Sequence, residues 1–184
     1  MKSIEAIFWG ALAFIVALII EVISSSLGDD PSHSGQVDPG FRTVMLLVLI
    51  EEMAKLFVLM RAAAGKIIAP APILIFGTVF GLIEVWLFGQ KNELGVMNGL
   101  AATLPIVLVH LGTAAIYGYC LNRKNWAWLA GGLAVGIIFH AAYNFQEILQ
   151  VSSPDIRWMQ VSALTLAAIA LFFAQTSSLH DKEA

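Results

Sequence analysis

The chain of 184 residues is 59% hydrophobic and 12% charged, whereas a soluble domain carries roughly 25% charged residues. This composition excludes an ordinary soluble domain and indicates an integral membrane protein. The formal net charge of -3 is small, and the chain has no basic tract with interleaved aromatic residues, so we do not expect nucleic acid as a partner.

Apolar runs separated by loop-like segments follow one another along the whole chain. A helix needs about 20 mostly apolar residues to cross roughly 30 Å of hydrocarbon. The runs are close to this length, and no stretch is left for a separate soluble domain. The sequence therefore predicts an all-α, polytopic integral membrane protein, with one transmembrane domain over residues 1–184. The expected spans are 4–27, 41–64, 72–89, 97–121, 126–149 and 157–175.

The first run, 4–27, is too long for the apolar core of a signal peptide, which has about 7 to 15 residues. We interpret it as a transmembrane helix. The segment after it, GDDPSHSGQVDPG at 28–40, is acidic and rich in turn-forming residues. It is expected to form a solvated loop outside the membrane.

The second run, 41–64, contains three charged residues within LIEEMAKLF. A charged side chain at mid-bilayer costs roughly 2.5 to 3.5 kcal/mol, so these residues are expected to face the interior of the helix bundle. Lys55 is one helical turn from both Glu51 and Glu52, and its ammonium can pair with either carboxylate. One carboxylate is then left over, which a purely structural ion pair does not explain.

The third run, 72–89, carries one acidic residue within GTVFGLIE. Gly77, Gly81 and Glu84 are spaced by four and three residues and so share one helix face. Small residues at this spacing let transmembrane helices approach closely. Glu84 is therefore expected to point at a neighbouring helix and not at lipid.

The fourth and fifth runs each place a histidine deep within an apolar stretch. His110 lies about halfway along the fourth run. In the fifth run, Gly132, Gly136, His140 and Asn144 follow one another at intervals of four residues. This interval forms a single stripe on a helix, with two small residues at its base and two polar side chains one turn apart.

Positive charge predicts the orientation of the bundle. With the N-terminus inside, six lysine and arginine residues lie on cytoplasmic segments and three lie on outer ones, which favours cytoplasmic N- and C-termini in the plasma membrane. The inner set is Lys2, Arg61, Lys66, Arg123, Lys124 and Lys182, and the outer set is Arg42, Lys91 and Arg157.

Four consecutive spans thus bring ionisable side chains to similar depth, and a common intramembrane site is expected. Carboxylates crowded in a low dielectric cannot all be ionised, so one is suited to act as a general base for water. Neutral imidazole and carboxamide groups can hold a developing oxyanion. We find no intramembrane Ser, Thr or Cys that stands beside a base, which argues against a covalent nucleophile. The candidate residues are Glu51, Glu52, Glu84, His110, His140 and Asn144.

Four motifs in order, EEMAK, FGLIE, VHLGTAAIYGY and FHAAYN, resemble the motif set of PrsW-type intramembrane proteases, relatives of the CAAX prenyl proteases and bacteriocin-immunity proteins. The resemblance covers residues 41–149. It is closer to the PrsW type, because Lys55 follows the glutamate pair where CAAX enzymes tend to show EExxxR, and Glu84 stands where they show FxxxH. Farnesylated substrates are therefore not expected.

The resemblance implies an intramembrane endopeptidase that cuts a membrane-anchored protein, such as an anti-sigma factor in site-1 cleavage. It implies that Glu51 or Glu52 activates the hydrolytic water. Glu84 and His110 would orient this water, and His140 and Asn144 would stabilise the oxyanion. A zinc-dependent version would take its ligands from Glu52, Glu84, His110 and His140. Metal-free catalysis is favoured, and no cofactor is expected, because the chain has no HExxH motif.

Two other functions fit the same features. Intramembrane carboxylates also mark ion pathways, as in a proton-coupled transporter or channel. Such transporters are typically built from repeats with broken helices, and here only Pro105 favours that interpretation. A non-catalytic immunity or scaffold protein of the same fold is the other alternative. The sequence indicates neither the oligomeric state nor the identity of the substrate.

Overall fold

The protein folds into six helices, in a computed structural model that describes residues 1–28, 41–64, 66–92, 96–149 and 154–180. The predicted all-α class is confirmed. Of the outer loop expected at 28–40, Gly28 is the last residue of α1 and residues 29–40 lie outside the described residues. The helices are α1 (Ser3–Gly28), α2 (Phe41–Ala63), α3 (Pro70–Asn92), α4 (Val96–Asn122), α5 (Trp126–Leu149) and α6 (Pro154–His180).

Five of these helices contain a stretch of 18 to 22 residues that is long and apolar enough to cross a membrane. Large apolar side chains such as Phe8, Phe57 and Ile138 lie exposed on the outer faces, as expected where a helix meets lipid. The exception is α2, because Glu51, Glu52 and Lys55 interrupt its apolar run. The candidate spans are Ser3–Ser24, Pro70–Leu87, Leu104–Asn122, Trp126–Phe145 and Met159–Thr176.

Two helices begin at a proline that precedes the expected span. α3 starts at Pro70, ahead of the expected span 72–89, and α6 starts at Pro154, ahead of the expected span 157–175. Proline is favourable in the first turn of a helix, because the first N–H groups have no partner within the helix and the ring fixes φ near the helical value. A proline at these positions is therefore typical of both a loop and the start of a helix.

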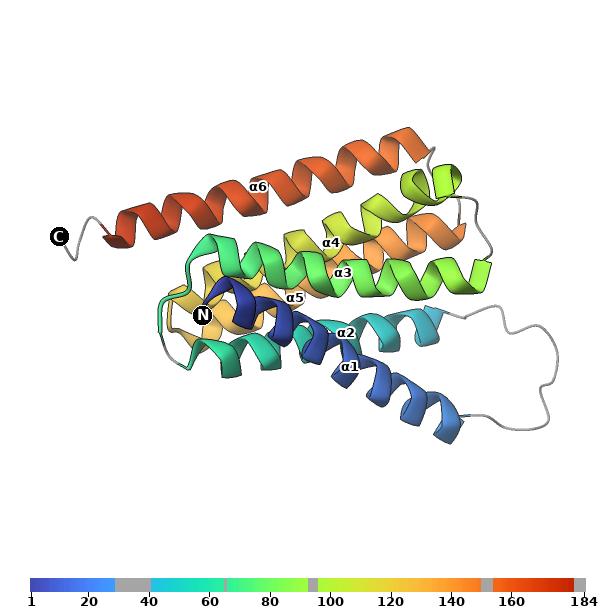
Figure 1. The fold of residues 1–184 in the computed structure, drawn as a ribbon, viewed down its shortest axis with the longest axis horizontal. Coiled ribbons are helices and arrows are strands. Elements are labelled where there is room, and N and C mark those ends of the chain that lie inside the picture. Colours follow the sequence, from blue (N-terminus) through green and yellow to red (C-terminus); the bar gives the residue numbers. More distant parts are fainter. Residues whose placement is uncertain (29–40, 65, 93–95, 150–153, 181–184) are drawn as a thin grey trace.

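Helix α4 is the centre of the bundle, and packs against α2, α3, α5 and α6. α1 lies across α2 and α3, while α6 runs along the other side of α4 (Figure 1). α1 begins and α6 ends at one end of the bundle, called here the N-terminal end (Figure 1). The α2–α3 and α4–α5 connections lie at the same end.

Glycines bring α3 close to α4, as the sequence predicts. A Cβ atom added to Gly77 would lie 2.7 Å from the carbonyl oxygen of His110, and one added to Gly81 would lie 2.8 Å from Cα of Val107. Neither position has room for a larger residue. This approach allows Glu84, on the same face, to reach a side chain on α4.

The charge bias and the even number of helices generate a prediction about topology. In a chain with Cys120→Ala, a single cysteine placed by Lys124→Cys in the α4–α5 turn should react with a membrane-impermeant thiol reagent only after the membrane is disrupted. A cysteine placed by Ser34→Cys should react in intact cells. The opposite labelling pattern would show that the bundle is inverted.

Candidate functional site

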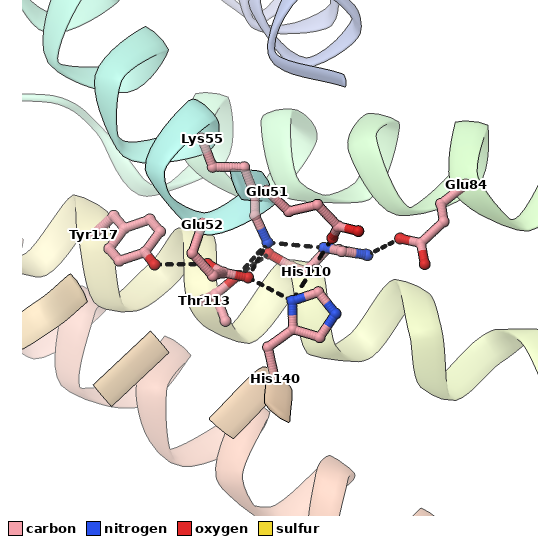
Figure 2. Close-up of polar contacts among 8 residues, drawn as sticks. All are labelled: Glu51, Glu52, Lys55, Glu84, His110, Thr113, Tyr117 and His140. Atoms are coloured by element: carbon pink, nitrogen blue, oxygen red, sulfur yellow. Dashed lines mark hydrogen bonds and ion pairs between the residues drawn. The ribbon is translucent and has the colours of Figure 1, made fainter. Parts of the chain in front are cut away.

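Ionisable side chains from four neighbouring helices meet in the middle of the bundle (Figure 2). This group includes five of the six predicted site residues, and we call it the polar cluster. Its members are Glu51, Glu52 and Lys55 from α2, Glu84 from α3, His110, Thr113 and Tyr117 from α4, and His140 from α5.

The ammonium group of Lys55 is at the centre of the cluster and is completely buried. It donates to Glu52 Oε1, to His110 Nδ1 at 2.9 Å and to Thr113 Oγ1 at 3.1 Å. An ammonium group has three hydrogens, so each has an acceptor. Nζ also lies 4.9 Å from the centre of the Phe80 ring. The charge of Lys55 is therefore fully compensated without solvent.

Glu52 is the carboxylate that pairs with Lys55, and it is also completely buried. Its Oε1 accepts a second hydrogen bond, from His140 Nδ1 at 2.7 Å. Its Oε2 accepts from the Tyr117 hydroxyl at 2.6 Å. With three protein donors around it, Glu52 holds α2, α4 and α5 together.

The partners of the two histidines determine which ring nitrogens carry hydrogen. Lys55 can only donate, so His110 Nδ1 accepts and its Nε2–H donates to Glu84. Glu52 can only accept while ionised, so His140 Nδ1 carries the hydrogen. Each histidine is thus held by one carboxylate, His110 by Glu84 and His140 by Glu52. The two rings lie edge to face, 5.0 Å apart.

Glu51 differs from its neighbour in having a carboxylate oxygen without a protein donor. Its Oε2 lies 3.7 Å from His140 Nδ1, which is too long for a hydrogen bond, and no other group in the described part of the chain donates to it. The side chain is 15% exposed, whereas that of Glu52 is 0% exposed. Oε2 itself is buried, so Glu51 is the glutamate with an unused acceptor inside the cluster.

Glu51, His110 and His140 also form a group with the donor atoms of a metal site. One ligand atom from each lies within 4.8 Å of the others, so a point between them is at most 4.8/√3, or about 2.8 Å, from all three. This distance suits a hydrogen-bonded water. Zinc bonds are about 2.0 to 2.2 Å long, and two histidines with a glutamate form a familiar zinc ligand set.

The fit to a metal has one obstacle, because both ring nitrogens of His110 already have partners. For His110 to bind an ion, Lys55 would have to leave Nδ1 or Glu84 would have to leave Nε2. The group also differs from the zinc set expected from the sequence. Glu51 takes the place of Glu52 and Glu84, whose carboxylates hold the histidines.

Asn144 is the predicted site residue that does not join the cluster. It lies one turn along α5 from His140 and is half-buried, and no hydrogen bond links it to the other described members.

Three residues in or beside the cluster are not among those predicted from the sequence. Thr113 and Tyr117 lie three and seven residues after His110, which places them on one face of α4, and this spacing was the available signal. Glu21 on α1 lies near enough to Glu51 for their charges to interact. It could have been found as an acidic residue inside the first apolar run.

The small residues of the α5 stripe make room for the cluster. A Cβ atom on Gly136 would overlap the Tyr117 side chain, and one on Gly132 would overlap Cys120 Sγ. Only glycine at position 136 therefore lets the Tyr117 hydroxyl pass between α4 and α5 to reach Glu52. Both glycines of this stripe thus pack closely against α4.

The pairing of the Lys55 charge with the Glu52 carboxylate generates a prediction about stability. Lys55→Met leaves the Glu52 carboxylate buried without its cation, which should lower the free energy of unfolding by roughly 3 to 5 kcal/mol. Glu51→Gln alters a carboxylate whose Oε2 accepts no hydrogen bond from the described part of the chain, and it should lower the free energy of unfolding by much less. Denaturation of both variants in the same detergent measures the difference. Equal stability of the Lys55→Met variant and the wild type would contradict this account.

Comparison with known proteins adds no family to these observations. No family model matches the sequence, and no curated protein and no solved structure matches it. The resemblance to PrsW-type proteases therefore rests on the four motifs of α2 to α5.

Proposed function

We propose that the protein is an intramembrane protease in which Glu51 activates a water molecule to hydrolyse a peptide bond of a membrane-anchored protein. One observation carries the proposal. Of two adjacent glutamates, Glu52 is fully held by protein donors, while Oε2 of Glu51 has no donor in the described part of the chain, and a carboxylate oxygen of Glu51 lies within 4.8 Å of ligand atoms of His110 and His140. A general base must be able to contact the water whose proton it takes.

The other members of the cluster position the reacting groups. His140 Nδ1–H is bonded to Glu52, so Nε2 is the ring nitrogen that would meet a water or the substrate. Nε2 can donate to an oxyanion only when the ring is an imidazolium, a form that the Glu52 carboxylate stabilises. His110 is bonded at both nitrogens and serves to position the group. Asn144, one turn from His140, is the second proposed oxyanion donor.

The hydrolysis needs no further reactant. Glu51 takes a proton from the water as its oxygen bonds to the peptide carbonyl carbon. The carbon–nitrogen bond then breaks, and the proton on Glu51 passes to the leaving nitrogen. The products are a carboxylic acid and an amine. If a metal is bound, Glu51, His110 and His140 would hold it, and it would supply Lewis-acid chemistry.

A transporter or channel is less well supported by the geometry. The cluster is partly exposed at Glu51 and at Glu84, whose side chain is 29% exposed. Towards the N-terminal end it stops at Tyr117, which is 0% exposed and lies in the core with Phe76 and Phe172. Among the described residues, the polar path is therefore closed at one end. An immunity or scaffold protein of this fold would keep the shape without cleaving a substrate.

The proposal predicts different effects of one substitution at two adjacent positions. Glu51→Gln should lower cleavage of a single-span membrane protein by about 10² to 10⁴ without loss of folding, because a general base contributes that factor. Glu52→Gln should chiefly lower the melting temperature. The measurement is cleavage of a panel of single-span proteins, including anti-sigma factors, co-expressed with each variant.

The same substitution at the exposed Glu5 is the matched control and should leave cleavage unchanged. Near-normal cleavage by both the Glu51→Gln and the Glu52→Gln variant would mean that the cluster is structural. Loss of cleavage at Glu52 alone would mean that the wrong glutamate has been assigned as the base.

Metal dependence has a separate test. Because Lys55 and Glu84 occupy the nitrogens of His110, the purified protein should keep its activity after exhaustive treatment with a chelator. Loss of activity on chelation, with recovery on adding stoichiometric zinc, would contradict this prediction. The zinc content of a His140→Ala variant would then show whether the group that includes Glu51 holds the ion.

A further inference from the structure

A second site lies on the lipid-facing side of α4, away from the polar cluster. α6 packs mainly against α4 and touches α5 little. A groove of about 320 Å³ runs along the seam between α5 and α6, within the range of about 300 to 1,000 Å³ found for ligand pockets. Its walls are apolar and include Ile116, Tyr119, Trp128, Gly131 and Leu171.

The groove has a positively charged group fixed at its N-terminal end. Arg123 Nη2 donates to the Tyr119 hydroxyl at 2.8 Å. The guanidinium carbon lies 5.0 Å from the centre of the Tyr119 ring and 5.3 Å from that of Trp128. Both rings also line the groove. The same two side chains therefore form the wall of the apolar space and hold the cation beside it.

The position of Arg123 in the chain places it at the level of lipid headgroups. It lies in the short turn between α4 and α5, where two candidate spans end and begin. The exposed Lys124 is the next residue, and the turn 122–125 contains no acidic residue. Trp126 and Trp128 are exposed beside the turn, as is typical of side chains at a membrane–water interface.

We propose that this groove binds one anionic phospholipid, with an acyl chain along the seam between α5 and α6 and the phosphate on Arg123. A guanidinium has five N–H donors in a planar fork that matches phosphate geometry, and Tyr119 uses one of them. Lys124 adds a second positive charge. The groove thus matches such a lipid, because its apolar length fits an acyl chain and the cation at its end fits the phosphate.

The charge at one end is the reason for preferring a lipid to a transmembrane helix of another protein. A transmembrane helix would pack along the whole seam between α5 and α6, and its binding does not in general require a cation at the headgroup level. A second groove, of about 430 Å³ between Phe139, Tyr143 and Leu164, lies farther along α5 and α6 and gives an acyl chain room to continue. This inference uses no member of the polar cluster and does not depend on the proposed function.

The test uses the purified full chain, titrated with dioleoyl phosphatidylglycerol or with dioleoyl phosphatidylcholine, with bound lipid counted by native mass spectrometry. The wild type should retain phosphatidylglycerol more tightly than phosphatidylcholine. Arg123→Gln should weaken phosphatidylglycerol binding about fivefold, because one basic side chain at an anionic membrane surface has an effect of this size. Arg61→Gln, which removes an exposed arginine on α2, is the matched control and should have no effect.

A second variant tests the apolar part of the site. A Cβ atom at Gly131 has no neighbour within 4 Å, so Gly131→Leu should fold normally and fill the groove. It should weaken the binding of both lipids. Equal binding of the two lipids by the wild type, or equal effects of Arg123→Gln and Arg61→Gln, would overturn the proposal. So would unchanged lipid binding by Gly131→Leu with loss of a co-purifying membrane protein, because the groove would then be a helix-binding surface.

Discussion

The arrangement of the bundle depends on one buried ammonium group. Moving Lys55 out of water costs several kcal/mol, and this cost is offset only if good acceptors surround it. Its acceptors come from α2 and α4. Through Glu52 it is linked to His140 on α5, and through His110 to Glu84 on α3. Any displacement of these helices would leave a charge or a polar group unpaired in a low dielectric, where the penalty is largest.

Close packing of the helices is the second requirement. In lipid the hydrophobic effect does not drive helices together, and small residues at the interfaces permit the contact. Gly77 and Gly81 bring α3 against α4, and Gly136 accommodates Tyr117 between α4 and α5. The glycine stripes and the polar cluster thus depend on each other. Packing at the glycines positions the helices, and the hydrogen bonds of the cluster make one arrangement of the helices specific.

The sequence predicts the helices and the convergence of the ionisable residues, because both follow from the cost of placing charge in lipid. It does not predict which glutamate pairs with Lys55, since residues three and four positions away are both within reach on a helix. Glu52 is held in place for this pairing because Tyr117 and His140 donate to it. These are tertiary contacts. Thr113 and Tyr117 were missed because single hydroxyl groups are common in apolar helices. α3 and α6 begin at a proline ahead of the expected spans, because proline is favourable in the first turn of a helix.

If Glu51 is the base, the shape of the cluster also restricts where a substrate is cut. Both partly exposed carboxylates, Glu51 and Glu84, lie away from the N-terminal end, where buried Tyr117 closes the path. A peptide bond inside a transmembrane helix has its carbonyl in a hydrogen bond, and exposing it in lipid costs several kcal/mol. A bond at the end of a span needs little unwinding. The scissile bond of a substrate should therefore lie near the end of its span that faces the open side of the cluster, and not at the middle of the membrane.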